Sequence, residues 1–136
     1  MKSLITMIFG LFVVFYAYAQ EEQVAVVDGA VITFEEESHD FGDIYQGDKV
    51  EYVFKFENTG TQPLIITNVQ TTCGCTASEW PREPVLPGTS ADLKVNFNSA
   101  GKFGRQNKVI SVISNSTAPM NQVKIITNVL PKKDTN

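Results

Sequence analysis

The sequence predicts an all-β fold in which two antiparallel sheets pack against each other as a sandwich. Three observations favour this fold class. Several short segments alternate between apolar and polar residues, turn residues separate these segments, and no segment after residue 19 keeps the 3.6-residue apolar period of a helix. Many short strands with regularly spaced turn signals are typical of sandwiches.

The first nineteen residues have the pattern of a secretory signal peptide. Lys2 supplies a positive start, an apolar run follows from Leu4 to Tyr16, and Ala17-Tyr18-Ala19 places small residues where a signal peptidase cleaves. A membrane anchor is the alternative, but the apolar run is shorter than the roughly 20 residues that cross a bilayer. We therefore expect cleavage after Ala19 and an exported protein, periplasmic or extracellular, with no stable membrane span.

The rest of the chain predicts one domain with a short leader and a short tail. Residues 20–30 are expected to form an N-terminal leader, residues 31–131 the β domain and residues 132–136 a C-terminal tail. A chain of this length buries roughly two-thirds of its unfolded surface. One hydrophobic core is therefore enough to hold the domain together.

Two strands are expected directly after the leader. Residues 31–37 alternate briefly and end in three acids, and residues 49–58 alternate clearly. The apolar face of the second segment consists of Val50, Tyr52, Phe54 and Phe56. Such alternation indicates a strand with one buried face and one face in water.

Turn residues separate the later strands. Asn58 and Gly60 mark a turn in the NTGT stretch, where Gly60 is expected to take a positive φ. A hairpin, or a turn between sheets, then leads into a strand at residues 63–70. Pro87 and Gly88 mark another turn. Further strands are expected at residues 90–98, 107–115 and 121–130.

The charge balance argues against one class of partner. Fifteen acidic residues oppose eleven basic residues, which gives a formal net charge of −4. Nucleic-acid binding requires clustered Lys and Arg, so no nucleic-acid partner is expected. No catalytic residue can be assigned either, because the sequence offers no recognisable Ser-His-Asp arrangement. We expect a protein that is not an enzyme.

Both cysteines lie in one short motif, Cys73-Gly74-Cys75. In an extended strand their Cα atoms would be about 6.6 Å apart, near the upper limit for a disulfide, so a bond requires the chain to contract at Gly74. Three interpretations stay open: a disulfide or reversible dithiol, two inert core thiols, or a metal site. A bond between these residues would close a tiny loop, stabilise the fold little and be easily reduced.

The stretch HDFG holds the only histidine. We interpret it as a structural turn in which Asp40 bonds to nearby backbone, Phe41 closes the end of the sandwich and Gly42 takes a special φ. The functional alternative is that His39 binds a metal ion together with the two cysteines. Two thiolates suit Cu(I), whereas zinc prefers four ligands. We expect no cofactor, with copper or zinc as the alternative.

Five motifs, in this order, resemble the bacterial Domain of Unknown Function 1573 family. The resemblance covers roughly residues 32–130 and implies an immunoglobulin-like antiparallel sandwich of about seven strands, related to major-sperm-protein and Hydin-type domains. It also implies an exported protein from a Bacteroidetes-like bacterium, but no function. The motifs are HDFG (39–42), FENTG (56–60), CGCT (73–76), LPGTS (86–90) and SAGKFGRQNKVISVISN (99–115).

Two functional hypotheses follow from these observations. The first is an exported, non-enzymatic immunoglobulin-like module that binds a protein or glycan partner or gives structural support. The alternative is a redox-active dithiol or copper-handling protein that uses the Cys-Gly-Cys motif. Replacing Cys73 with Ser separates them, because partner binding survives under the first hypothesis and activity is lost under the second.

Overall fold

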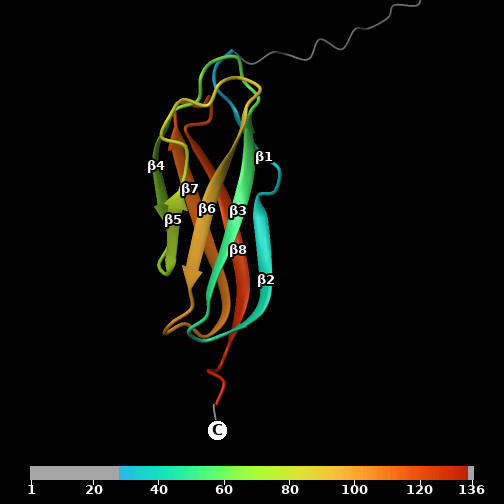
Figure 1. Cartoon of the computed structure of the whole chain (residues 1–136), viewed down its shortest axis with the longest axis vertical. Helices are drawn as coiled ribbons and strands as arrows, with labels where there is room; N and C mark the ends of the chain where they lie inside the picture. The colour runs from blue at the N-terminus through green and yellow to red at the C-terminus, as the bar shows by residue number, and fades with distance from the viewer. Residues whose placement is uncertain (1–27, 135–136) are drawn as a thin grey trace, which may run out of the picture.

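The computed structural model describes residues 28–134, without the side chain of Ser78, and forms two four-stranded sheets packed face to face (Figure 1). One sheet has the strand order β1-β3-β6-β5 and the other β2-β8-β7-β4. The strands are β1 (Ile32–Phe34), β2 (Ser38–Tyr45), β3 (Lys49–Asn58), β4 (Ile66–Thr71), β5 (Cys75–Glu79), β6 (Ser90–Asn98), β7 (Gly104–Ser114) and β8 (Met120–Leu130).

The predicted all-β sandwich is confirmed, with eight strands in these residues instead of about seven. Strand pairs are antiparallel except β2 and β8, which run parallel. Strands β2 and β5 were not expected, since their sequences lack a long apolar alternation. Both are edge strands, and an edge strand needs only one neighbour to complete half of its backbone hydrogen bonds.

The inner faces of the two sheets form a single core. The alternation predicted for residues 49–58 and 90–98 is confirmed, since Phe54, Phe56, Leu93 and Phe97 are fully buried. Burying each such side chain contributes about 1.5–3 kcal/mol relative to leaving it exposed. The facing sheet supplies Ile110, Val112, Val123, Ile125 and Val129.

The N-terminal predictions mostly lie outside the described residues. The signal peptide at residues 1–19 and residues 20–27 of the predicted leader fall in this group. The last leader residues already belong to the fold, because Ala30 is buried and forms a bridge with Ser116. Within residues 28–134 there is no helix long and apolar enough to cross a membrane.

Asn58 organises the connection from β3 to β4, which crosses from one sheet to the other. Its fully buried side chain accepts hydrogen bonds from the backbone N–H groups of Val31 and Gly60. It also donates to the carbonyl oxygens of Gln62 and Val85. The predicted turn residue is therefore a buried hub that ties three chain segments together.

The prediction of a positive φ at Gly60 is wrong, since Gly60 is not among the glycines with positive φ. The backbone of the N-terminal segment passes too close for a side chain here. A Cβ at Gly60 would meet the carbonyl oxygen of Gly29 and would lie 2.6 Å from the nitrogen of Val31. Close backbone approach, and not backbone conformation, requires the glycine.

The turn predicted at Pro87 and Gly88 is confirmed. The N–H of Thr89 donates to the carbonyl of Leu86 at 3.0 Å, and Gly88 has a φ of +77°. Proline at the second position and a left-handed glycine at the third position are the signature of a type II turn.

Candidate functional site

The Cys-Gly-Cys motif forms the corner between β4 and β5, where the chain passes from one sheet to the other. The N–H of Cys75 donates to the carbonyl of Thr72 at 3.1 Å, and Gly74 has a φ of +94°. The contraction at Gly74 that a disulfide requires is therefore present. Cys73 occupies the tip of this tight turn, and Cys75 is the first residue of β5.

Several hydrogen bonds fix the corner in place. The carbonyl of Gly74 accepts from the N–H of Asn98 at 3.0 Å, and the hydroxyl of Thr71 donates to the carbonyl of Cys75 at 2.9 Å. Thr72 is bonded to Val109 through both its N–H and its hydroxyl. Because these partners come from β6 and β7, the corner is held by both sheets.

The two thiols have different surroundings. Cys73 is exposed, and the ammonium group of Lys102 donates to its Sγ at 3.3 Å. Cys75 is partly buried and packs against the core. Burial raises the pKa of Cys75 to about 11, although the positive charges of Lys108 and Lys102 act in the opposite direction. Both cysteines are free thiols in this structure.

The HDFG stretch is a bulge inside β2 and not a turn. The register with β8 shifts between Asp40 and Asp43, and this shift bends an edge strand without ending it. Two details are confirmed: Asp40 accepts a hydrogen bond from the N–H of Gly42 at 2.8 Å, and Gly42 has a φ of +70°. Phe41 is partly buried against the core.

His39 packs against aromatic rings and does not meet the cysteines. Its ring stacks on Tyr52 with centroids 3.7 Å apart, and Phe41 meets it edge-on. In the part of the chain that the structure describes, no group of three or more His, Cys, Asp or Glu side chains is placed to hold a metal ion. The proposed three-residue site of His39, Cys73 and Cys75 is therefore not assembled.

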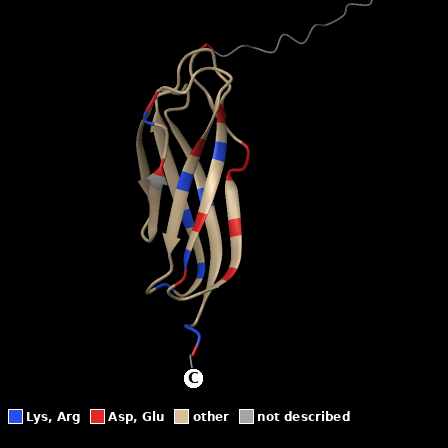
Figure 2. Ribbon diagram, in the orientation of Figure 1, with Lys and Arg blue, Asp and Glu red and all other residues tan. Residues whose placement is uncertain are grey.

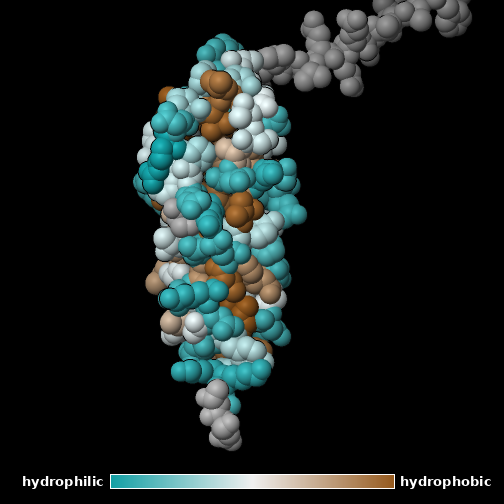
Figure 3. Space-filling model, viewed as in Figure 1, coloured by the Kyte–Doolittle hydropathy of each residue, from teal (hydrophilic) through white to brown (hydrophobic). Residues whose placement is uncertain are grey.

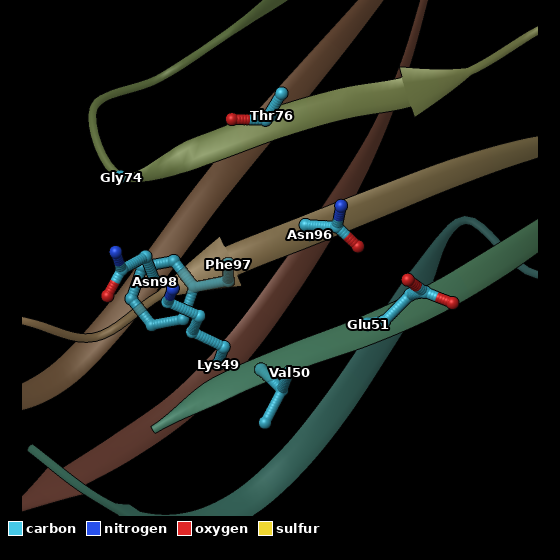
Figure 4. Close-up of a pocket in the computed structure, with 8 residues that line it drawn as sticks. All are labelled: Lys49, Val50, Glu51, Gly74, Thr76, Asn96, Phe97 and Asn98. Carbon is cyan, nitrogen blue, oxygen red and sulfur yellow. The ribbon is translucent and has the colours of Figure 1, made fainter. Parts of the chain in front are cut away.

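A shallow pocket of about 300 Å³ lies beside the corner and is lined by residues of β3, β5 and β6 and by Gly74 (Figure 4). Lys49, Glu51 and Asn96 supply polar groups, and Val50 and Gly74 supply apolar surface. Sequence reasoning did not find this pocket, because its residues come from segments that meet only in the folded sheet.

The side of the sandwich formed by β4 and β5 is almost free of charge. Residues 58–78 contain no Asp, Glu, Lys or Arg, and Glu79 at the end of β5 is the first charged residue after Glu57. The opposite side is acidic, with Glu35–Glu37 before β2 and Asp40 and Asp43 within it. Figure 2 shows this contrast, with red along β2 and a plain β4.

Exposed apolar side chains occur at several positions in the described part of the chain. Ile65, Leu86, Phe103 and Met120 are the most exposed of them, and Ile65 and Leu86 directly follow the bridged residues Leu64 and Val85. The face shown in Figure 3 is mainly hydrophilic with isolated apolar spots. A binding mode based on a large apolar surface is therefore not favoured on this face.

Comparison with known proteins identifies the fold and the family. The family model described as "Protein of unknown function (DUF1573)" matches residues 32–129. A search of the curated proteins found no match.

Three solved structures illustrate the likeness, and at these identities they show the fold alone. A protein of unknown function from Porphyromonas gingivalis W83 is 23% identical, with a TM-score of 0.64 over 76% of this chain and 48% of that one. The chain thus spans about half the length of that protein. The secreted serine protease VesC from Vibrio cholerae is 12% identical, with a TM-score of 0.59 over 73% of this chain and 23% of that one. The PapD-like domain 7 of human CEP192 is 10% identical, with a TM-score of 0.59 over 75% of this chain and 87% of that one.

Proposed function

The chain belongs to the DUF1573 family, and we propose that it is an exported, non-enzymatic binding module that adds an extended segment of a partner protein to the free edge of β4. The observation that carries the proposal is the uncharged β4–β5 side of the sandwich. An edge strand offers a row of backbone donors and acceptors that another chain can use.

Natural sheets usually guard their edges with charges, bulges or very short strands. The β1–β2 side has all three features, because β1 has three residues, β2 carries a bulge and the acids cluster there. Strand β4 also shifts register between Ile66 and Asn68, but it carries no charge over Ile66–Thr71. A side left without charged residues, opposite a guarded one, is the arrangement expected of a docking edge.

The geometry of β4 also suits strand addition. Residues Asn68–Thr71 pair in continuous register with Ile113–Ile110 of β7, which keeps this part of β4 extended. Strand β4 is the last strand of its sheet, so its other edge has no strand neighbour among residues 28–134. An incoming segment would therefore form a fifth strand of this sheet.

The chemistry of the edge defines the partner. Backbone groups on β4 match the backbone of another extended chain more closely than they match sugar hydroxyls. Because β4 offers no charge, a charged partner segment would lose hydration with no counter-charge in return. We therefore expect a segment of uncharged, β-branched and small polar residues.

Two further features support binding rather than catalysis. The single histidine is held between aromatic rings in a structural role. The corner beside β4 is fixed by hydrogen bonds to both sheets, so the edge is presented on a rigid support.

The test screens the purified domain against a phage-displayed library of random peptides of about nine residues, a length that covers one strand, and in parallel against a glycan array. We expect enrichment of uncharged peptides rich in β-branched residues. Enrichment of glycans alone would contradict the proposal and would direct attention to the pocket beside the corner.

A matched pair of variants locates the binding edge. Gln70 on β4 and Gln122 on β8 both flank Ser111 of β7 in the same row of the sheet, and both are exposed. Gln70→Lys places a charge on the edge strand and should weaken binding of a selected peptide about tenfold, which is about 1.4 kcal/mol. Gln122→Lys adds the same charge two strands away and should leave the affinity unchanged. Equal effects of the two substitutions would show that the peptide binds elsewhere.

A further inference from the structure

The corner between β4 and β5 also carries chemistry that edge binding does not use. We propose that the corner is a thiol–disulfide exchange site that reacts with a small disulfide. Cys73 is the attacking thiol, and Cys75 is the resolving thiol. The proposal is independent of the β4 edge, because it rests on the side chains of the turn.

The position of Lys102 assigns the first role to Cys73. The Nζ of Lys102 lies 3.3 Å from Sγ of Cys73, so a positive charge stands where a thiolate forms. Cys73 is exposed, which gives a small disulfide access to the sulfur. An exposed thiol beside a fixed cation is the environment typical of reactive cysteines.

The backbone around Lys102 holds this contact in place. Its N–H donates to the carbonyl of Ser99 at 3.0 Å, and its carbonyl accepts from the side chain of Gln46 at 3.1 Å. The side chain then passes beside Gly74, where a Cβ would lie 3.2 Å from Cε of Lys102. Glycine between the cysteines thus leaves room for the lysine as well as allowing the turn.

Cys75 suits the second role. It lies two residues from Cys73 on the same turn but is partly buried against the core, so an external disulfide reaches it less easily. The burial that raises its pKa keeps it protonated at neutral pH, which further favours Cys73 as the first to react. Lys108 and Lys102 are the cations that act on it.

The exchange proceeds in two steps. The Cys73 thiolate attacks one sulfur of the small disulfide, the S–S bond of that molecule breaks, and one small thiolate leaves and takes a proton. Cys75 then loses its proton and attacks Sγ of Cys73, the mixed disulfide breaks, and the second small thiolate leaves and is protonated. Two protein thiols are oxidised to one disulfide, and the small disulfide is reduced to two thiols.

The test exposes the reduced protein to oxidised glutathione, quenches with acid and measures intact and peptide masses. The parent should end two hydrogens lighter, without an adduct. Cys75→Ser should stop with one glutathione on Cys73, and Cys73→Ser should form its adduct at least about tenfold more slowly. Thermal midpoints of both variants, measured alongside, check that the fold is kept.

Variants of the lysine test its part directly. Lys102→Met should slow the adduct on Cys73 by about threefold or more, since the cation that favours the attacking thiolate is lost. Lys102→Arg should keep most of the rate, and Lys124→Met, on the exposed part of β8, should keep all of it. Equal reactivity of the two cysteines, a Lys102→Met rate equal to that of Lys124→Met, or thiols that react only after unfolding would each overturn the proposal.

Discussion

Gly60 and Gly42 require glycine for different reasons. At Gly60 there is no space for a side chain, whereas at Gly42 the backbone conformation disfavours one. The Cβ position at Gly60 is occupied by the passing N-terminal backbone, while a Cβ at Gly42 would have no neighbour within 4 Å. Gly42 instead has a φ of +70°, which most side chains disfavour. The same residue type therefore serves two different physical needs in one domain.

Substitution by Asn separates these two cases. Gly42→Val should destabilise the protein by about 1–3 kcal/mol, and Gly42→Asn should cost clearly less, because Asn tolerates a left-handed backbone. At Gly60, Val and Asn should both cost about 1–3 kcal/mol or more, since either side chain clashes with backbone. Urea denaturation of the four variants measures this, with Gln62→Ala as an exposed control. A Gly60→Asn variant as stable as the parent would contradict the steric explanation.

Asn58 is the buried polar residue with the largest expected effect on stability. Asn58→Ala leaves the N–H groups of Val31 and Gly60 and the carbonyl of Gln62 without their side-chain partner, whereas the carbonyl of Val85 still accepts from the N–H of Leu64. The free energy of unfolding should fall by about 2–4 kcal/mol, because a buried polar group without a hydrogen-bond partner is not compensated for its removal from water. Urea denaturation of this variant checks the value, and a loss below that of an ordinary surface substitution would show that water replaces the side chain.

The raised pKa of Cys75 predicts a pH profile for its alkylation. Only the thiolate reacts, and burial lifts the pKa from 9.0 to about 11 against the opposing charges of Lys108 and Lys102. In a Cys73→Ser variant, the rate with iodoacetamide should therefore keep rising about tenfold per pH unit beyond pH 9. A plateau at or below pH 9 would show that the thiol is not desolvated in the fold.

At the scale of elements, the sequence predicted the central strands well and the edge strands poorly. Strands β3 and β6 bury one face, so their alternation could be read directly. Strand β5 places only the small residues Cys75 and Ala77 toward the core, and the bulge in β2 resembles a turn in sequence. A strand at an edge has fewer packing constraints, so it carries a weaker pattern.

The candidate site was predictable only in part, for a related reason. The need for contraction at Gly74 follows from covalent geometry and is met in the structure. The approach of Lys102 to Cys73 joins residues 29 positions apart and leaves no local signal in the sequence. The buried hub at Asn58 also depends on segments that meet only after folding. The sequence pattern therefore does not reveal which polar groups from distant segments meet in the fold.

At the scale of the whole molecule, charge is distributed unevenly over the two sides of the sandwich. The acidic β1–β2 side repels other acidic chains and discourages pairing there, whereas β4 carries no charged residue and β5 carries only Glu79 (Figure 2). Under the proposed function, the uncharged edge of β4 receives the partner segment and the acidic side is guarded against pairing. The thiol corner lies at the end of the open edge, where β4 passes into β5.

Amide hydrogen exchange, with and without a peptide selected from the library, tests the central claim most directly. If the peptide adds a strand to the sheet, the backbone N–H groups of β4 within Ile66–Thr71 should become protected, because they gain hydrogen-bond partners. Strand β2 at the opposite edge serves as the internal control and should exchange as before. New protection confined to β2, or to the pocket residues of β3 and β6, with β4 unchanged, would contradict the assignment of the docking edge.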